Sequence, residues 1–326
     1  MKKVTVIGSG SWGTALAVML AENGHEVFIW SRRQDAVDEL LKERTNKKYL
    51  PGVVIPDSIQ ATTDRKEAVD GADIVILAVP SRAVAQTVRD FAPYLKTWQI
   101  LVNVAKGLEP ETLFLLSDVI KREAPQCEVC VLSGPSHAEE VARKVPTACL
   151  IACENEAVAK LVQEEFANPR FRLYTNTDLI GVEIGAALKN VIGLAAGILD
   201  GLEWYGLKGA LMARAPIEVG RLIGYFGGNP HTAYGLAHLG DYEATLFSKH
   251  SHNRMFGEKF ARGEDFGKLA EGVPTLEAVK TIADAKGIDM PICQALYKVI
   301  YEKADIKETI RGMFNRDLKQ EFDHIC

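Results

Sequence analysis

The 326-residue chain has little cysteine and no long block of charge of one sign. Its six cysteines are too few for a secreted scaffold built on disulfides, and they are typical of a protein from a reducing cytosol. The lack of any block of five or six like charges excludes a nucleic-acid-binding arm and a polybasic membrane patch. Because no run of 18 uncharged apolar residues is present, we predict no membrane span. These absences predict a soluble, cytoplasmic protein.

Convergent sets of metal ligands are also missing. Cys127 and Cys130, followed by Cys149 and Cys153, have a spacing that resembles a zinc tetrad, but both pairs fall in β-like runs. Side chains of a strand alternate between its faces, so Cys127 and Cys130 point to opposite sides, whereas a tetrahedral site needs converging thiolates. His250 and His252 are separated by one residue, but no third ligand type lies nearby. We therefore predict that the protein holds no metal.

What is present is the composition of an ordinary globular protein. Hydrophobic residues make up 47% of the chain and charged residues 25%, which excludes a disordered polypeptide. The formal net charge is −5, so the surface is mildly acidic. At roughly 150 residues per domain, a chain of this length predicts two domains.

Apolar runs alternate with helical patterns over residues 1–178. The runs lie at 4–7, 26–30, 74–79, 100–104, 129–132 and 149–152. This alternation is typical of a parallel sheet covered by helices on both faces. We predict an α/β fold in which residues 1–178 form a Rossmann-like, doubly wound dinucleotide-binding domain.

The strand pattern ends near residue 178. Helical patterns interrupted by Gly and Pro then follow at 179–199, 207–225, 230–238, 254–262, 275–286 and 291–303. They predict that residues 179–326 form an all-helical substrate-binding domain. We expect the active cleft between the two domains.

A glycine pattern follows the first predicted strand directly. Gly8, Gly10 and Gly13 form a G-x-G-x-x-G motif that opens the first predicted helix. Such glycines allow a tight turn, close approach of the backbone to a pyrophosphate, and close packing of helix on strand. The helix N-terminus adds N–H groups and the positive end of its dipole. The motif predicts a dinucleotide site, although a turn without a ligand could use the same glycines.

The end of the second predicted strand indicates which dinucleotide binds. An NAD-selective site usually has Asp or Glu there, whereas this chain has Arg32 and Arg33. Guanidinium groups suit a ribose 2′-phosphate in both charge and geometry. The two arginines could also merely begin a solvated helix. The sequence favours NADPH and leaves NADH open.

An apolar helix with a lysine in it is the strongest catalytic signal. The stretch 179–199 is apolar nearly all round and contains Lys189 and Asn190. Such a helix is expected to be buried, and an unpaired buried ammonium is costly. We therefore predict that both side chains face the active site, the alternative being that the lysine stem carries its charge to water.

Other polar groups follow strands or fall in the helical half. Lys106 stands after the strand at 100–104, where open α/β sheets bind ligands. The segment 134–136 follows the next strand in the same way. Asp241 and the cluster 251–254 supply a carboxylate and several hydrogen-bond donors.

Taken in order, these motifs resemble those of bacterial NAD(P)-dependent glycerol-3-phosphate dehydrogenases over essentially the full chain. The similar segments are 8–15, 46–52, 79–81, 106–108, 133–136, 188–190, 240–241 with Thr245, 253–254 and 271–272. The resemblance implies reversible reduction of dihydroxyacetone phosphate to sn-glycerol 3-phosphate for glycerophospholipid synthesis. The implied partner is a small phosphate ester, with no nucleic acid; the oligomeric state is left open, a homodimer included.

The resemblance also implies a role for individual residues. Lys189 would be the acid–base residue. The dinucleotide would be bound by Gly8, Gly10, Ser11, Trp12, Gly13, Arg32, Arg33, Tyr49, Lys106, Ala138 and Glu271. The substrate would be bound by Lys106, Gly134, Ser136, Lys189, Asp241, Ser251, His252 and Asn253.

One position departs from the family pattern. The family usually has Arg where this chain has His252, and a neutral imidazole lacks the fork and the fixed charge of arginine. Tyr242 and Leu246 begin further differences nearby. The departure puts substrate affinity and its pH dependence in doubt more than the reaction type.

Two other functions remain as alternatives. One is another two-domain nicotinamide-dependent reductase, of the 2-ketopantoate or β-hydroxyacid type, against which Lys106 and the segment 133–136 argue. The other is a dinucleotide-sensing regulator without turnover, which would not need the buried Lys189 beside Asn190.

Overall fold

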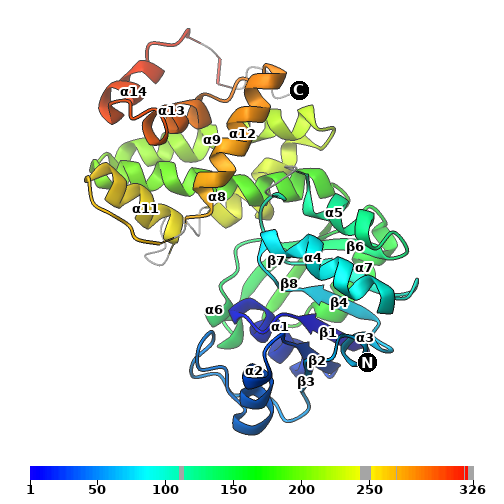
Figure 1. The fold of residues 1–326 in the computed structure, drawn as a ribbon. Coiled ribbons are helices and arrows are strands. Elements are labelled where there is room, and N and C mark those ends of the chain that lie inside the picture. The colour runs from blue at the N-terminus through cyan, green and yellow to red at the C-terminus, as the bar shows by residue number, and fades with distance from the viewer. Residues whose placement is uncertain (110–113, 243–250, 269, 319, 322–326) are drawn as a thin grey trace. The chain divides into compact units, whose positions relative to one another are not determined.

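The structure is a computed structural model that describes residues 1–109, 114–242, 251–268, 270–318 and 320–321 (Figure 1). The sequence predictions that involve Thr245, Leu246 and His250 lie outside the described residues. The chain divides into two compact units, Met1–Leu179 and Ile180–Cys326, and each is described by itself.

The first unit is a sheet with helices on its faces, as predicted. The described strands are β1 (Lys3–Ile7), β2 (Glu26–Trp30), β3 (Gln60–Thr62), β4 (Ile74–Leu77), β5 (Ile100–Asn103), β6 (Glu128–Ser133), β7 (Thr147–Ala152) and β8 (Phe171–Asn176). The helices are α1 (Ser11–Glu22), α2 (Gln34–Asp38), α3 (Arg65–Val69), α4 (Ser81–Phe91), α5 (Leu116–Glu123), α6 (Ala138–Ala142) and α7 (Glu156–Phe166). Short π and 3-10 turns follow α2 and α4, at Glu39–Glu43 and Ala92–Tyr94.

The strand order is β3-β2-β1-β4-β5-β6-β7-β8. The first six strands are parallel, which confirms the Rossmann-like arrangement. β7 differs from the prediction because it pairs with β6 in the antiparallel sense, and β8 runs parallel to β7. Only the short α6 separates β6 from β7, and the chain returns beside β6 without the long crossover that a parallel neighbour needs.

The sheet has a hydrophobic core on each face. Along β4, Ile74 and Ile76 belong to one buried cluster, and Val75 and Leu77 belong to the other. All four side chains are buried, which explains why this strand is apolar at every position.

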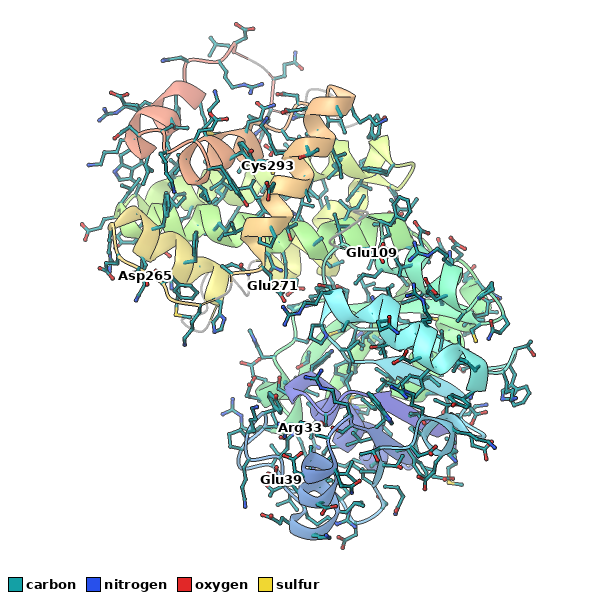
Figure 2. All side chains as sticks on the ribbon, viewed as in Figure 1. Arg33, Glu39, Glu109, Asp265, Glu271 and Cys293 are labelled. Carbon is teal, nitrogen blue, oxygen red and sulfur yellow. The ribbon has the colours of Figure 1, made fainter. Side chains whose placement is uncertain are left out.

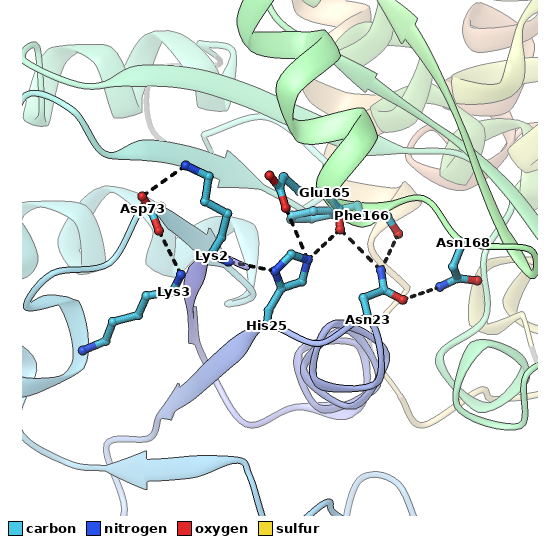
Figure 3. A network of polar contacts seen from close by, with 8 residues as sticks. All are labelled: Lys2, Lys3, Asn23, His25, Asp73, Glu165, Phe166 and Asn168. Carbon is cyan, nitrogen blue, oxygen red and sulfur yellow. Dashed lines mark hydrogen bonds and ion pairs between the residues drawn. The ribbon is translucent and has the colours of Figure 1, made fainter.

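A polar network joins the amino ends of the parallel strands (Figure 3). The carboxylate of Asp73 accepts from the Lys3 N–H at 2.9 Å and from the Lys2 ammonium at 3.4 Å. The Lys2 N–H donates to Nδ1 of His25 at 3.2 Å, so Nε2 carries the proton and donates to the Glu165 carbonyl at 2.8 Å. These hydrogen bonds connect the starts of strands β1, β2 and β4 to the end of α7.

The same network ties the end of α1 to the end of α7. Asn23 is the C-cap of α1, and its Nδ2 donates to the Phe166 carbonyl at 3.1 Å. The Oδ1 of Asn23 accepts from the Asn168 amide at 3.0 Å. The network lies at the edge of the sheet opposite to the carboxyl ends of β1–β6, where a ligand is expected. It therefore supports the scaffold rather than a ligand.

The second unit is helical in its described part, as predicted. Its helices are α8 (Leu179–Gly201), α9 (Tyr205–Tyr225), α11 (His252–Ala261), α12 (Gly272–Lys286), α13 (Pro291–Ile300) and α14 (Ile306–Met313). The 3-10 turn η3 (Pro230–Tyr234) and the π-helical turn η4 (Leu236–Gly240) lie between α9 and α11. α14 was not predicted from the sequence.

α8 is the core helix of this unit. Glycine brings its backbone against α11: a Cβ on Gly197 would lie 2.0 Å from the Arg254 carbonyl oxygen, and one on Gly257 would lie 2.2 Å from that of Leu194. The helix is long and apolar enough to cross a membrane, with a mean hydropathy of 1.6, but 89% of that stretch is buried inside the protein. The burial and the close packing identify α8 as a core helix.

Candidate active site

The three glycines after β1 have the geometry that their motif predicts. Gly8 has φ +117°, and a Cβ there would lie 2.3 Å from the Ala78 carbonyl oxygen. A Cβ on Gly13 would lie 2.3 Å from the Gly8 carbonyl oxygen. Around Gly10, in contrast, no described protein atom lies within 4 Å of the Cβ position. Two glycines are thus required by the protein itself, and the third leaves its surface open.

A dinucleotide pyrophosphate fits this turn. Gly10 is the N-cap of α1 and offers no side-chain acceptor, so the first N–H groups of the helix are not capped by a side chain. Asn46 holds the turn by donating to the Ser9 carbonyl at 3.0 Å and to the Thr14 hydroxyl at 2.8 Å. Ser11 and Trp12 follow at the start of α1 and are partly exposed.

The two arginines predicted to read the ribose lie at the end of β2. Arg33 lines a small pocket together with Ser9, Glu39, Lys48 and Tyr49. Arg33 and Glu39 are labelled in Figure 2. Its Nε lies 3.2 Å from a carboxylate oxygen of Asp35, while Arg32 is exposed.

The pocket contains a further cation that the sequence analysis missed. Lys48 lines it and lies with its ammonium 5.0 Å from the centre of the Tyr49 ring. A 2′-phosphate in this pocket would meet two cationic side chains, and Glu39 would oppose it. The signal in the sequence was the Lys next to the motif residue Tyr49.

The remaining predicted residues of the first unit follow β5 and β6. Lys106 donates from its ammonium to the Gly134 carbonyl at 3.1 Å, and the Ser136 hydroxyl donates to the same oxygen at 3.3 Å. Gly134 has φ +132°, which only glycine adopts readily. Ala138 begins α6 and is buried in a cluster with Ala15 and Leu50. The structure thus brings Lys106, Gly134 and Ser136 together.

In the second unit, Lys189 is paired. Its ammonium lies 2.6 Å from Oδ1 of Asp241, and the two side chains are 13% and 4% exposed. A buried charge is tolerated when a hydrogen-bonded opposite charge compensates it, and this pair meets that condition. The lysine stem therefore does not carry the charge out to bulk water. Instead, α8 places the ammonium against a carboxylate that is almost fully buried.

Asn190, next along α8, is part of a second contact. The Asn253 amide donates to Asn190 Oδ1 at 2.9 Å and accepts from the Gly272 N–H at 2.8 Å. A Cβ on Gly272 would lie 2.5 Å from the Asn190 carbonyl oxygen. Glu271 is exposed at the N-terminal end of α12, beside this contact (Figure 2).

The start of α11 carries Ser251 and His252. The Ser251 hydroxyl caps the helix by accepting from the Arg254 N–H at 3.3 Å. His252 is exposed, and its ring meets the Phe266 ring edge-on at a centroid distance of 5.9 Å. The arginine that follows is engaged elsewhere: Arg254 Nε donates to Asp200 at 2.7 Å.

Sequence reasoning missed one further residue of this site, His238. It is fully buried in η4, three residues before Asp241, and it contacts α8. The available signal was a histidine inside the apolar segment that leads to Asp241. Among the described residues no group of His, Cys, Asp and Glu could hold a metal ion.

Comparisons with known proteins identify the family. Residues 3–159 match the family described as NAD-dependent glycerol-3-phosphate dehydrogenase N-terminus, and residues 178–311 match its C-terminus. The chain is 42% identical to glycerol-3-phosphate dehydrogenase [NAD(P)+] of Bacillus pumilus, covering 100% of this chain and 97% of the relative. It is 43% identical to the Listeria monocytogenes enzyme of the same name, covering 98% of each.

Solved structures give the same result. Glycerol-3-phosphate dehydrogenase from Coxiella burnetii superposes with a TM-score of 0.88 at 35% identity, covering 97% of this chain and 99% of that one. A ketopantoate reductase from Ralstonia eutropha superposes with a TM-score of only 0.60 at 18% identity, covering 96% of this chain and 100% of that one, and so shares the fold alone. The chain belongs to the NAD-dependent glycerol-3-phosphate dehydrogenase family.

Proposed function

We propose that this protein catalyses the reversible, NAD(P)H-dependent reduction of dihydroxyacetone phosphate to sn-glycerol 3-phosphate, and so supplies glycerophospholipid synthesis in the cytoplasm. The observation that carries the proposal is the Lys189–Asp241 ion pair on the core helix of a chain whose two halves both match this family. The substrate is a small phosphate ester. A homodimer is the assembly to test, by light scattering.

Lys189 supplies the proton. When bound, the dinucleotide supplies the hydride for the ketone carbon. The Lys189 ammonium donates to the ketone oxygen as negative charge develops there, and in the reverse direction the neutral amine takes the proton from the hydroxyl. The Asp241 carboxylate, 2.6 Å away, orients the ammonium and balances its charge.

The remaining predicted residues bind and orient the substrate. Lys106, with Gly134 and Ser136, contributes a cation and hydrogen-bonding groups after β5 and β6. Ser251, His252 and Asn253 contribute donors at the start of α11. These three residues carry no fixed charge, whereas an arginine in place of His252 would add one. The start of α11 therefore binds the phosphate mainly by hydrogen bonds.

NADPH is the favoured dinucleotide. Arg33 and Lys48 line the pocket at the end of β2, and Arg32 lies exposed beside Arg33. Gly8, Gly10, Ser11, Trp12 and Gly13 bind the pyrophosphate side, with Tyr49, Ala138 and Glu271 as the remaining contacts.

A spectrophotometric assay tests the proposal. We expect oxidation of NADPH at the nicotinamide band on addition of dihydroxyacetone phosphate, at a higher kcat/KM than with NADH. Turnover with 2-ketopantoate or a β-keto acid in place of dihydroxyacetone phosphate would favour the other reductase. Dinucleotide binding without any turnover would favour the regulator.

A further inference from the structure

His238 connects the two segments that carry the Lys189–Asp241 pair. The residue is 0% exposed and lies in η4, three positions before Asp241. Its Nδ1 lies 2.8 Å from the carbonyl oxygen of Gly185 on α8. Gly185 is four residues before Lys189, one helical turn away. The imidazole therefore touches the turn of α8 that presents the lysine.

The hydrogen bond fixes the tautomer of His238. A carbonyl oxygen only accepts, so Nδ1 carries the proton and donates it to Gly185. Nε2 is then an acceptor, and it is buried with no hydrogen-bond partner among the described residues. Burial lowers the pKa of His238 to about 4, so the ring is neutral at ordinary pH and adds no charge beside the ammonium of Lys189.

The Gly185 carbonyl that accepts from His238 also accepts a backbone hydrogen bond from Lys189. In an α-helix the carbonyl of residue 185 accepts the backbone N–H of residue 189. Gly185 itself has no side chain that could restrain this turn, and glycine is a weaker helix former than alanine. A side chain that binds the Gly185 carbonyl restrains that turn.

The glycine and the histidine also fit each other sterically. A Cβ on Gly185 would lie 2.9 Å from the Cβ of His238, so only glycine lets η4 approach α8 this closely. The other side of the ring meets Tyr242 edge-on at a centroid distance of 4.9 Å. The imidazole is thus held between α8 and the residue that follows Asp241.

We propose that His238 is a positioning residue for Lys189: its Nδ1–H bond to Gly185 clamps the segment that carries Asp241 to the turn of α8 that carries Lys189. The inference rests on the proposed function, in which Lys189 is the proton donor. The clamp keeps the ammonium at the 2.6 Å separation from Asp241 and so in one orientation toward the substrate. A misplacement of about 1 Å in such a group can lower the rate by two orders of magnitude.

Two variants separate the hydrogen bond from the packing. His238→Leu fills much of the same space without a donor, while His238→Asn places an amide N–H near the position of Nδ1. We expect His238→Leu to lower kcat by about 10- to 100-fold with the KM for dihydroxyacetone phosphate changed by less than about threefold, because the loss is in the orientation of the proton donor. His238→Asn should recover most of that kcat. Equal losses in the two variants, or a loss confined to KM, would overturn the proposal.

A double-mutant cycle tests whether His238 acts through the ion pair. In an Asp241→Asn background the pair no longer exists, so adding His238→Leu should lower kcat by less than about threefold. If His238→Leu costs the same factor in both backgrounds, the residue acts independently of the pair and the proposal is wrong. Thermal unfolding of each variant shows that it is folded at the assay temperature.

A measurement that does not depend on turnover tests the clamp independently of the proposed function. Trace acetylation, read by mass spectrometry, compares Lys189 with Lys208, which is paired with Asp200 at 2.9 Å in the same unit and serves as the internal control. His238→Leu should raise the labelling of Lys189 several-fold and leave Lys208 unchanged, whereas His238→Asn should not. Unchanged Lys189 labelling overturns the clamp. Raised labelling in a protein that never reduces dihydroxyacetone phosphate upholds the clamp and refutes the proposed function.

Discussion

Replacing the buried Glu218 with glutamine should change how the stability of the second unit depends on pH. Glu218 lies in α9 and is 2% exposed. Its two carboxyl oxygens accept the N–H groups of Ile292, at 2.8 Å, and Cys293, at 2.9 Å, in the first turn of α13. Burial raises the pKa of this carboxyl from 4.5 to about 7, against the opposing effect of the two hydrogen bonds.

The direction of the effect follows from proton binding. Between pH 4.5 and about 7 the folded protein keeps a proton on Glu218 that the unfolded chain releases, so the free energy of unfolding falls as pH rises. The stabilisation is fully present below pH 4.5 and is lost by about pH 7. At about 1.4 kcal/mol per pKa unit, the loss is roughly 3 kcal/mol.

Glu218→Gln removes this titration and adds a constant cost. A glutamine side chain has one acceptor oxygen, so one of the two buried N–H groups loses its partner, which costs about 1–3 kcal/mol at every pH. We therefore expect the wild type to be the more stable protein at pH 5. By pH 8 the difference between the two proteins should have fallen by roughly 2–3 kcal/mol.

Hydrogen exchange of the amides of Ile292 and Cys293 under increasing urea measures this difference in stability within the second unit. Burial lowers the pKa of His238 to about 4 and gives a slope of opposite sign, but this slope is common to both proteins and cancels in the difference. Glu302→Gln, at an exposed position of the same unit, is the matched control and should not alter the pH dependence. Parallel stability curves for the wild type and Glu218→Gln between pH 5 and 8 would refute the reasoning.

Three further predictions concern the proposed reaction. Lys189→Met should lower kcat by about 10²–10⁴, with NADPH affinity by fluorescence titration nearly unchanged; near-normal kcat would move the search for the acid to Lys106. Replacing both Arg32 and Arg33 with Ala should raise the KM for NADPH far more than the KM for NADH, and equal effects in steady-state assays would exclude a 2′-phosphate role. His252→Arg should lower the KM for dihydroxyacetone phosphate, because arginine adds a fixed charge and a fork of donors that the imidazole lacks, and an unchanged KM in steady-state assays would contradict a phosphate contact.

Features set by short-range sequence could be predicted. Gly8 and Gly13 are required by close contacts of the turn with Ala78 and with each other, whereas Gly10 leaves the surface of the turn open. The apolar strands are buried on both faces, and the small residues of α8 do bring another helix into backbone contact. The contacting atoms mostly lie far along the chain, as Ala78 does for Gly8, but the required residue types fall together in a short window and are visible there.

Features set by distant partners could not be predicted. The direction of β7 depends on pairing with β6, and the apolar pattern of a strand is the same in both directions. The partner of Lys189 is 52 residues away, so the sequence indicated a buried lysine and an acidic residue for the same site, but not the direct contact between them. His238 was missed for the same reason, because its role depends on a carbonyl 53 residues away that carries no side-chain signal.

The start of α11 shows how scaffold contacts also define what the site can bind. Asn253 uses its side-chain oxygen to accept from Gly272 and one amide hydrogen to reach Asn190, so one donor hydrogen remains. The Ser251 oxygen accepts from Arg254, which leaves its hydroxyl proton to donate. The first-turn N–H groups of α11 are donors as well. The side-chain oxygens of Ser251 and Asn253 thus accept hydrogen bonds from the fold, and their remaining protons with the helix N–H groups suit an anion such as a phosphate.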